Sequence, residues 1–585
     1  MRVERHQVDG AAVRAALGDF PGRIGGRVRS LSRAEGMTGA EWRLVADEFL
    51  DHLGALSLGT PDLATPEARA LLVDAATAAT GAVSYAAFHP HGFFEVFLKY
   101  VNFGVDHEPG AGGPVRSVSP GEWTDALCLA VLADLCDGHV DAFLLARNAF
   151  AGRTAGTPAG ELTAGLAAVV LDDPGPEGTY PPGPEAKLAS VDAALDRLRA
   201  RAEETGEPLP DRPDGVALCA LRALAAGDRG AFDTALAGLL AGESAPHGPS
   251  AAPRTLLPRV PLALAALGYR TRGWAPAVST DYLPHALVTG FETPGPRVAG
   301  FGRDRRPDAV AALAAGPLVV ERPVRERTVT PQARARAGKR RDEAFAAGDG
   351  EPLSAWWLGA VLADQERLFK MCTEESGRVT RAQLAHLGLA SGAAAALFRL
   401  ALAEPGTTAE VTVDGRTLRY RAERGDRTAG PHWRKAVALA LVAGSSEDLA
   451  PTLLAGPALA RADDSAFAAY HEALHALLTG ADPEPAARRA LDRAGRLRDS
   501  GFPMPPAVLL SQLVAGDEES FGLALADALE AHRDQYLIAD RADDPDGALD
   551  LDILALACLA VRRGWSVRVE SAYLPRDLLR AAESS

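Results

Sequence analysis

The sequence predicts an all-α protein formed by tandem duplication of one helical-repeat-like, multi-helix unit, with a small β-hairpin. Two observations lead to this prediction. Ala and Leu abound, and both are strong helix formers, whereas aromatic residues make up only 6% of the chain. Segments of the first half also recur, in the same order, in the second half. Because 585 residues exceed the length of one ordinary domain, the duplication predicts two related halves.

The duplication rests on blocks of similar sequence separated by nearly constant offsets. The segment LRALAAGDRGAFDTALAGLL at 221–240 resembles LSQLVAGDEESFGLALADAL at 510–529, at an offset of 289. Upstream, Trp123 and its neighbours match Trp433 and its neighbours at an offset of 310. An offset that is constant within blocks and falls by about 20 between them indicates a longer loop in the first half.

Two pairs of aromatic residues follow the same pattern near the end of each half. Trp274 matches Trp565, and Tyr282 matches Tyr573, both at an offset of 291. Each Trp follows an Arg-Gly or Arg-Arg-Gly sequence that is typical of a helix C-terminus. We expect these four residues to be structural anchors of the repeat, each packed into its core with its NH or OH satisfied by one partner.

Apolar residues at helical spacing predict a series of amphipathic helices in each half. Trp42, Val45, Phe49 and Leu53 give one such stripe. Clusters of Gly and Pro separate the periodic segments and indicate where helices end. In the first half the expected helices lie near 40–57, 66–87, 119–137, 160–171, 185–204, 214–226, 229–241 and 255–270.

The clearest strand signal is AEVTVDGRTLRYRA at 409–422. Its alternating pattern surrounds Asp414 and Gly415, the pair preferred in type I′ hairpin turns. The corresponding segment of the first half, 94–104, fits a helix or a strand on its pattern alone. We favour a strand pair there as well, as in the second half.

The composition divides the chain into an N-terminal helical half at 1–300, a linker at 301–350 and a C-terminal helical half at 351–585. Arg, Pro and Gly are frequent in the linker, and one short helix is expected near 307–315. A nucleic acid could contact the basic residues of the linker, but the net charge of −16 argues against such a partner. We expect these residues to be solvated: Arg325, Arg327, Arg334, Arg336, Lys339, Arg340 and Arg341.

Cysteine usage and hydropathy predict a cytoplasmic protein without a membrane partner. The five Cys residues form no CxxC pair, so free thiols in a reducing compartment are expected. The N-terminal segment is charged and has no apolar core typical of a signal peptide. No stretch is expected to supply the roughly 20 apolar residues that span a bilayer.

The most specific catalytic motif is an HExxH string formed by His471, Glu472 and His475. On a helix its two His lie one turn apart and could bind Zn²⁺, with the Glu as general base. No third ligand follows at the usual spacing, and the matching helix of the first half, near 160–171, contains no His. We therefore expect a fortuitous match, with no catalytic residue, no metal and no cofactor. A zinc-dependent hydrolase is the alternative.

One segment differs between the halves in a way that suggests a partner surface. IADRADDPDGALDLD at 538–552 is rich in Asp, whereas its counterpart SAPHGPSAAPRTLL at 244–257 has no acidic residue. An acidic loop on a helical scaffold can meet a basic protein, and a solvated loop is the alternative. The candidate partner-binding residues are Asp540, Asp543, Asp544, Asp546, Asp550 and Asp552.

Several segments of the chain resemble the Immunity 49 family. They are ADEFLDHLGAL at 46–56, HPHGFFEVFLKYVNFG at 89–104, the block at 272–298 and the closing LAVRRGW and YLP strings. The family consists of large, Ala-rich actinobacterial proteins assigned to polymorphic toxin systems. The resemblance covers nearly the whole chain. It implies a mainly α-helical, non-enzymatic immunity protein and no catalytic residue.

The resemblance and the acidic balance together predict a protein partner. We expect the chain to bind and neutralise a cognate toxin domain, whose surface would be basic if the toxin is a nuclease. The alternative is a helical-repeat adaptor without any connection to toxins. The identity of the adjacent gene would separate these two functions.

Overall fold

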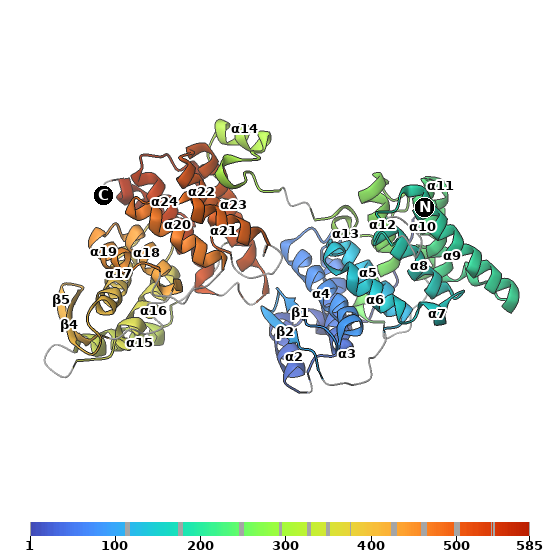
Figure 1. Ribbon diagram of the computed structural model, residues 1–585, viewed down its shortest axis with the longest axis horizontal. Helices are drawn as coiled ribbons and strands as arrows, with labels where there is room; N and C mark the ends of the chain where they lie inside the picture. The colour runs from blue at the N-terminus through green and yellow to red at the C-terminus, as the bar shows by residue number, and fades with distance from the viewer. Residues whose placement is uncertain are drawn as a thin grey trace. The chain divides into compact units, whose positions relative to one another are not determined.

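Segments rich in Ala and Leu form helices in both halves of the chain, which confirms the all-α prediction (Figure 1). The chain divides into two units, Met1–Thr293 and Pro294–Ser585. The computed structural model describes residues 2–34, 36–110, 118–173, 180–244, 251–291, 295–323, 329–346, 352–374, 376–422, 430–457, 465–496, 504–539, 541 and 544–583.

The first unit is a series of helices interrupted by one hairpin of two strands. Side-chain caps begin several of these helices; the Ser119 side chain, for example, accepts a hydrogen bond from the Glu122 backbone NH at the start of α5. The elements are α1 (Gly10–Leu17), α2 (Phe20–Ala34), α3 (Gly39–Gly59), α4 (Pro66–Phe88), β1 (Phe94–Leu98), β2 (Phe103–His107), α5 (Pro120–Ala133), η1 (Asp137–His139), α6 (Val140–Asn148), α7 (Ala151–Thr154), α8 (Pro158–Val170), α9 (Pro184–Thr205), η2 (Leu209–Asp211), α10 (Pro213–Ala226), α11 (Arg229–Glu243), η3 (Pro253–Leu256), α12 (Arg259–Arg272) and α13 (His285–Thr289).

The second unit repeats this arrangement around one large apolar core. Its elements are η4 (Gly300–Gly302), α14 (Pro307–Ala315), β3 (Leu318–Val319), α15 (Pro331–Phe345), α16 (Trp356–Met371), α17 (Arg381–Leu402), β4 (Thr408–Val413), β5 (Arg416–Arg421), α18 (Gly430–Ala443), α19 (Ser446–Ala455), α20 (Ala466–Thr479), α21 (Glu484–Arg496), α22 (Ala507–Ala515), α23 (Glu518–Leu537), η9 (Pro545–Ala548), α24 (Leu551–Arg562), β6 (Val569–Glu570) and α25 (Arg576–Glu583).

The order of elements and their packing confirm the tandem duplication. Two long helices come first in each repeat and pack on one another, α3 on α4 and α16 on α17. A hairpin and a further helix follow, and this helix packs on the last long helix of its unit, α5 on α12 and α18 on α24. Between them, α8 packs on α10 as α20 packs on α22. The sequence blocks therefore mark equivalent elements.

The two hairpins have the same place in the repeat. In the second unit, β4 and β5 are antiparallel, with Val413 opposite Arg416 across the predicted turn. In the first unit, β1 and β2 are also antiparallel, with Leu98 opposite Phe103. The strand pair that we favoured for 94–104 is thus confirmed, and it extends to His107.

The repeated Trp residues occupy equivalent environments. Trp274 packs on Phe232 with ring centroids 5.6 Å apart, and Trp565 packs on Phe521 at 5.7 Å. Both Trp side chains are half-buried, rather than enclosed in the core, because each follows the Gly that ends its helix. They cover the edge of the core and leave one face toward solvent.

The repeated Tyr residues are buried, and each lies beneath a guanidinium group. Tyr282 and Tyr573 are 0% and 2% exposed. Arg5 lies 5.9 Å from the ring centroid of Tyr282, and Arg322 lies 5.9 Å from that of Tyr573. The Tyr282 OH donates a hydrogen bond to a backbone carbonyl at the end of α11 (2.9 Å). The two aromatic anchors therefore share a cation–π contact from the segment that opens their own repeat.

A short parallel pairing shows that the repeat extends farther upstream than its sequence indicates. Arg2 forms a parallel bridge with Ser279. In the second unit, β3 pairs with β6 in parallel and places Val319 opposite Glu570. Ser279 and Glu570 differ by the same 291 positions as the repeated Trp and Tyr residues. The segment around 319–322 is thus the counterpart of 2–5.

The described part of the predicted linker, 301–350, folds with the second unit. Val320, Ala344 and Phe345 are buried in the core of that unit. The short helix expected near 307–315 is present as α14, which contacts α23. A composition rich in Arg, Pro and Gly is typical of linkers, but these few apolar side chains are sufficient to pack the segment.

The basic residues of that segment are distributed over two parts of the chain. Arg325 and Arg327 lie outside the described residues. The others belong to α15, where Arg340 forms an ion pair of 3.1 Å with Asp364 of α16. At least one of these charges therefore fixes α15 to its own unit.

The central helices α4 and α17 are long and apolar enough, by length and composition, to cross a membrane. This differs from the expectation that no such stretch exists. About two thirds of the apolar window is buried inside the protein in each case, 67% for α4 and 61% for α17. Their position between the other helices of each unit accounts for the apolar composition, because a core helix is covered on most sides.

Candidate functional site

A hollow lined by charged residues lies in the first unit, and we call it the charged cleft. It has a volume of about 520 Å³ and is bounded mainly by α3, α4 and α5. Apolar side chains, among them Leu44, Leu50 and Leu129, line part of it. The charged residues that line it are Arg43, Asp47, Glu122, Asp125, Arg254 and Arg259.

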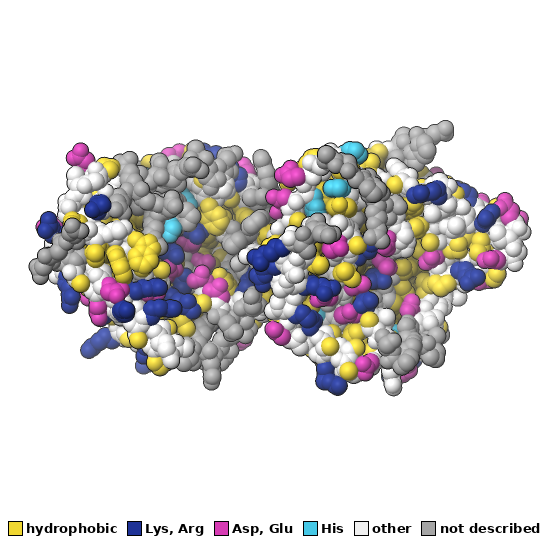
Figure 2. All heavy atoms as spheres, turned by 90° about the horizontal axis from the view of Figure 1, so that it is seen from below, with side chains coloured by type: hydrophobic (Ala, Val, Ile, Leu, Met, Phe, Trp, Pro, Cys, Tyr) yellow, Lys and Arg dark blue, Asp and Glu magenta, His cyan; other side chains and the backbone are white. Residues whose placement is uncertain are grey.

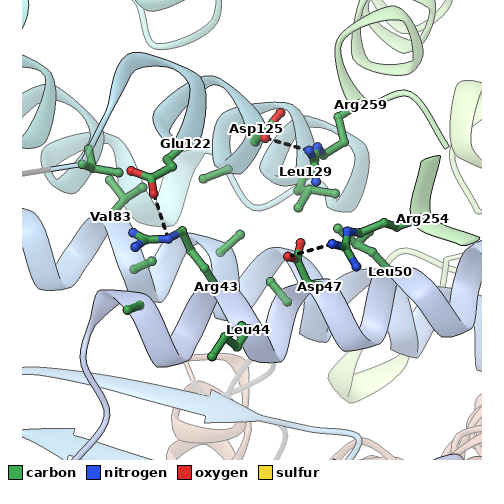
Figure 3. Close-up of a pocket in the computed structure, with 16 residues that line it drawn as sticks. Arg43, Leu44, Asp47, Leu50, Val83, Glu122, Asp125, Leu129, Arg254 and Arg259 are labelled. Carbon is green, nitrogen blue, oxygen red and sulfur yellow. Dashed lines mark ion pairs between the residues drawn. The ribbon is translucent and has the colours of Figure 1, made fainter. Parts of the chain in front are cut away.

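Two ion pairs connect α5 to neighbouring helices across the charged cleft (Figure 3). The Arg43 Nε atom of α3 lies 3.0 Å from Glu122 Oε1. The Arg259 Nη2 atom of α12 lies 2.8 Å from Asp125 Oδ2. Glu122 is held in place because its other carboxylate oxygen accepts a hydrogen bond from the Ser119 backbone NH (2.8 Å). The helix cap thus orients one wall of the cleft.

The third ion pair brings a distant segment onto α3. Arg254 of η3 has its Nη1 atom 2.6 Å from Asp51 Oδ2 and its Nη2 atom 3.6 Å from Asp47 Oδ2. Asp51 also accepts a hydrogen bond from the Arg254 backbone NH (3.0 Å). Gly54 permits this close approach, because a Cβ atom there would lie 2.2 Å from the Pro253 carbonyl oxygen.

The side chains of the charged cleft remain accessible to solvent. Those of the three ion pairs that line it are between 29% and 40% exposed. Leu44, on the same helix as Arg43, is 46% exposed. Ion pairs with this exposure contribute about 0–1 kcal/mol to stability. Their polar atoms and the adjacent apolar surface are therefore available to a partner.

Burial raises the pKa of Asp125 above its usual value, while the ion pair with Arg259 opposes this change. The negative charges of Asp47 and Asp214 raise the pKa further. With Asp51 included, four carboxylates surround three guanidinium groups. Each of the four carboxylates lies within 4 Å of at least one of these guanidinium groups.

The corresponding elements of the second unit hold a closed network of charges, which we call the lysine network. Lys370 Nζ lies 2.7 Å from Glu366 Oε1 and 2.7 Å from Asp546 Oδ1. Lys435 Nζ lies 2.7 Å from the other oxygen of Glu366. The side chains of Lys370 and Glu366 are only 8% and 7% exposed. The chain therefore satisfies these charges itself.

A further ion pair of the second unit joins α18 to α24. Arg434 Nη1 lies 3.3 Å from Asp552 Oδ2. Burial raises the pKa of Asp552 to about 6, although Arg434 opposes the shift. Burial would also raise the pKa of Asp546, but the contact with Lys370 lowers it below its usual value. The pKa of Asp552 therefore lies above the ordinary value of an Asp carboxyl, and the pKa of Asp546 lies below it.

Two of these contacts join the same pairs of elements in both units, with the signs of their charges exchanged. In the first unit, η3 and α12 supply the cations, and α3 and α5 supply the carboxylates. In the second unit, η9 and α24 supply the carboxylates, and α16 and α18 supply the cations. Equivalent elements of the repeat are therefore joined by ion pairs in both units, but the acidic and basic residues are on opposite partners.

The acidic segment of the second unit mostly stabilises its own fold. Asp540 and Asp543 lie outside the described residues. The Asp544 side chain accepts a hydrogen bond from the Asp546 backbone NH (2.9 Å), and Asp550 caps α24 by accepting from two backbone NH groups. Asp546, Asp550 and Asp552 have ion-pair partners, so among the described carboxylates of the segment the exposed Asp544 is the most available to a partner. The partner-binding role of the segment stays a prediction.

The HExxH string lies on α20, and its His side chains pack on an aromatic ring. His471 and His475 have ring centroids 5.8 and 5.9 Å from that of Trp433. The Nε2 atom of His475 lies 3.0 Å from a backbone carbonyl oxygen of α19. Glu472 forms an ion pair of 2.5 Å with Arg489. Among the residues that the structure describes, no group of three or more His, Cys, Asp or Glu side chains is placed to hold a metal ion.

Sequence reasoning did not identify the charged cleft, because its charges come from segments far apart in the chain. Asp51 and Arg254 are 203 positions apart. One signal was available: aligning Trp123 with Trp433 places Asp125 at the position of Lys435. A charged residue at the same position of two otherwise apolar helices indicates that an ion pair or a polar site lies next to both helices.

Comparison with known proteins gives one match. The family model described as Immunity protein 49 matches residues 60–287 and 376–578, one segment in each unit. No curated protein and no solved structure matches the chain. The two matched segments contain most of the sequence and the four repeated anchors, so the chain belongs to the Immunity protein 49 family.

Proposed function

We propose that this protein is a non-enzymatic immunity protein that binds and neutralises a cognate toxin domain of a polymorphic toxin system. The observation that carries the proposal is the family match, which recurs in both units. Immunity by binding requires a stable surface complementary to the toxin and no catalytic group. The proposed place of action is the cytoplasm, where the toxin would meet its target.

The distribution of charge supports a basic partner. The first unit has 36 acidic and 24 basic residues, a net charge of −12, whereas the second has 41 and 37, a net charge of −4. On the face drawn in Figure 2, acidic and basic side chains are interspersed. A negative unit attracts a positive protein and raises the rate of encounter. The first unit is therefore the better candidate for the initial contact.

Neutralisation follows if the immunity protein covers the surface that the toxin uses. A nuclease toxin holds phosphates with Lys and Arg side chains. Carboxylates placed over those side chains would exclude the nucleic acid from the toxin. The same residues would give the complex a marked dependence on salt, because exposed charges are screened over about 8–10 Å at physiological ionic strength.

The proposal is tested with the toxin domain encoded next to this protein. Co-expression should restore growth to cells that produce the toxin, and calorimetry with the purified proteins should give a saturable complex. The association rate should fall steeply between 50 and 200 mM NaCl. A neighbouring toxin that neither binds nor is neutralised would contradict the proposal and favour an adaptor without any connection to toxins.

A second measurement separates binding from enzymatic inactivation. Toxin released from the complex by high salt should have an unchanged mass and should regain its full activity. A covalently altered or cleaved toxin would show that the protein acts as an enzyme, and the non-enzymatic part of the proposal would then be wrong.

A further inference from the structure

The charged cleft and the lysine network are equivalent places in the repeat, but they differ in the residue that α5 and α18 contribute: Asp125 in the first unit and Lys435 in the second. Lys435 occupies the space between α16 and α18 and bonds to Glu366. At the same place in the first unit, Asp125 faces α3 across a cleft of about 520 Å³. The position of Lys435 thus carries a cation that bonds to α16, whereas the position of Asp125 borders a cleft that is open to solvent.

We propose that the charged cleft binds a cationic side chain, Arg or Lys, presented by the protein partner. The cation takes the place that Lys435 has in the second unit. The identity of the partner as a toxin rests on the function proposed above, but the chemistry of the site does not. Of these two sites in the described residues, the charged cleft is the one that can receive a cation from outside.

The geometry of the cleft suits a side chain that is apolar along its stem and charged at its end. Leu44 and Leu50 line the cleft and can contact the aliphatic part of an Arg or Lys. Asp47 is 3.6 Å from the nearest guanidinium nitrogen of Arg254, so its carboxylate has capacity for a closer donor. Asp125 lies on the opposite wall, and an entering cation would lie between the two.

The balance of charge favours a cation over an anion. Each guanidinium group that lines the cleft already has a carboxylate partner within 4 Å. An anion would have to displace one of these carboxylates and would then meet the remaining ones. When Asp51 is counted, four carboxylates face three guanidinium groups, so an entering cation balances the remaining negative charge without breaking an ion pair. Like charges brought together cost several kcal/mol at a protein interface, so an anionic ligand is disfavoured.

The test places a cation in the cleft by mutation. Leu44→Lys should occupy the site from within, as Lys435 does in the second unit. Leu58→Lys is the matched control: it adds the same charge on the same helix, α3, at a similar exposure of 49% against 46%, and Leu58 does not line the cleft. The probe is a hexa-arginine peptide, measured by calorimetry at 50 and 150 mM NaCl.

We expect the wild-type protein to bind the peptide at one saturable site. Leu44→Lys should weaken binding by about tenfold or more, since close charge pairs at interfaces couple strongly, whereas Leu58→Lys should change it by less than about twofold. Unfolding midpoints should be the same for all three proteins. Equal weakening by both substitutions would show a bulk charge effect and would overturn the proposal.

A second pair of variants removes carboxylates instead of adding a cation. Asp47→Asn with Asp125→Asn should weaken the hexa-arginine complex at least as much as Leu44→Lys. Asp196→Asn with Glu204→Gln makes the same charge change on α9, where both side chains are well exposed, at 73% and 66%. This control should bind like the wild type. A cleft variant that also binds like the wild type would overturn the proposal.

The same variants with the adjacent toxin distinguish this inference from the proposed function. If the toxin binds the wild type and the Leu44→Lys variant equally, the cleft is not the site, but the immunity function stands. If hexa-arginine binding depends on the cleft and no toxin binds, the site stands and the immunity function is wrong.

Discussion

The two units of this protein share a scaffold and differ in how its charges are satisfied. In the second unit, Lys370 and Glu366 are almost fully enclosed and bond to one another. In the first unit, the ion pairs around the charged cleft are about one third exposed. The two units therefore share the anchors of the fold, whereas one of the two equivalent sites is enclosed and the other is partly exposed. Similarity between repeats is a guide to architecture and a poor guide to function.

Substitution of the matched residues Trp123 and Trp433 has the largest expected effect and tests whether the two units depend on them equally for stability. The indole NH of Trp123 donates to the Phe143 carbonyl (2.8 Å), and that of Trp433 donates to the Thr452 carbonyl (2.9 Å). Both rings are 0% exposed. Replacement of either Trp by Ala should cost about 3–5 kcal/mol. Hydrogen exchange read by mass spectrometry should show the loss in the mutated unit; losses that differ by more than about 2 kcal/mol would break the equivalence.

Removal of one cation from an ion pair in each unit has the next largest expected effect on stability. It tests whether the enclosed pairs of the second unit contribute more than the exposed pairs of the first. Lys370→Met removes one cation from the enclosed Glu366, which is 7% exposed, and also the partner of the more exposed Asp546; this should cost about 3 kcal/mol. Arg259→Met removes a pair that is 30% and 40% exposed and should cost at most about 1 kcal/mol. Urea unfolding of both variants checks the difference. Equal losses would mean that burial does not separate the two sites.

The pH dependence of stability should differ between the wild type and Asp552→Asn. The pKa of Asp552 in the folded protein is about 6, above the ordinary value of 3.8. Between these values the folded state binds the proton more tightly than the unfolded state. This carboxyl therefore makes the unfolding free energy fall as the pH rises from about 4 to 6.

Asn does not titrate, so the variant should lose this contribution, by at most about 1.4 kcal/mol per pH unit. Urea unfolding of the second unit at several pH values measures it as the difference between wild type and variant. Removal of the contact with Arg434 shifts the whole curve, and only the slope is informative. Parallel curves from pH 4 to 6 would contradict the prediction.

The smallest expected effect concerns the acidic segment that the sequence marked as a partner surface. Asp546 is unsuitable for this test because it holds Lys370, whereas Asp544 is exposed. Asp544→Asn keeps a capping side chain and should change stability by less than about 0.5 kcal/mol. It should lower the association rate with the toxin by less than about twofold at low salt. If Asp544→Asn lowers the association rate more than Leu44→Lys does, the acidic segment is the partner site and the charged cleft is not.

The parts of the fold that local patterns determine could be predicted from the sequence. Gly227 and Gly516 have φ angles of 74° and 72° at helix ends, and the Asp after each caps the next helix. These short-range requirements leave a recognisable sequence, and so does the Asp414 turn. The pairing of Val319 with Glu570 could not be predicted from the sequence, because a strand of two residues is too short to show an alternating apolar pattern. Nor could the charged cleft, since each ion pair joins segments with unrelated sequences.

The contact between Asp51 and Arg254 also has a consequence for the timing of synthesis. The two residues are 203 positions apart, and Arg259 is needed to complete the same wall. Helices such as α3 and α4 can form and pack while the chain is still emerging, because their contacts are local. The wall formed by η3 and α12 cannot be in place until residue 259 has left the ribosome. At ~5–20 residues per second, a newly started chain therefore needs about ten seconds or more before this wall of the charged cleft can be complete.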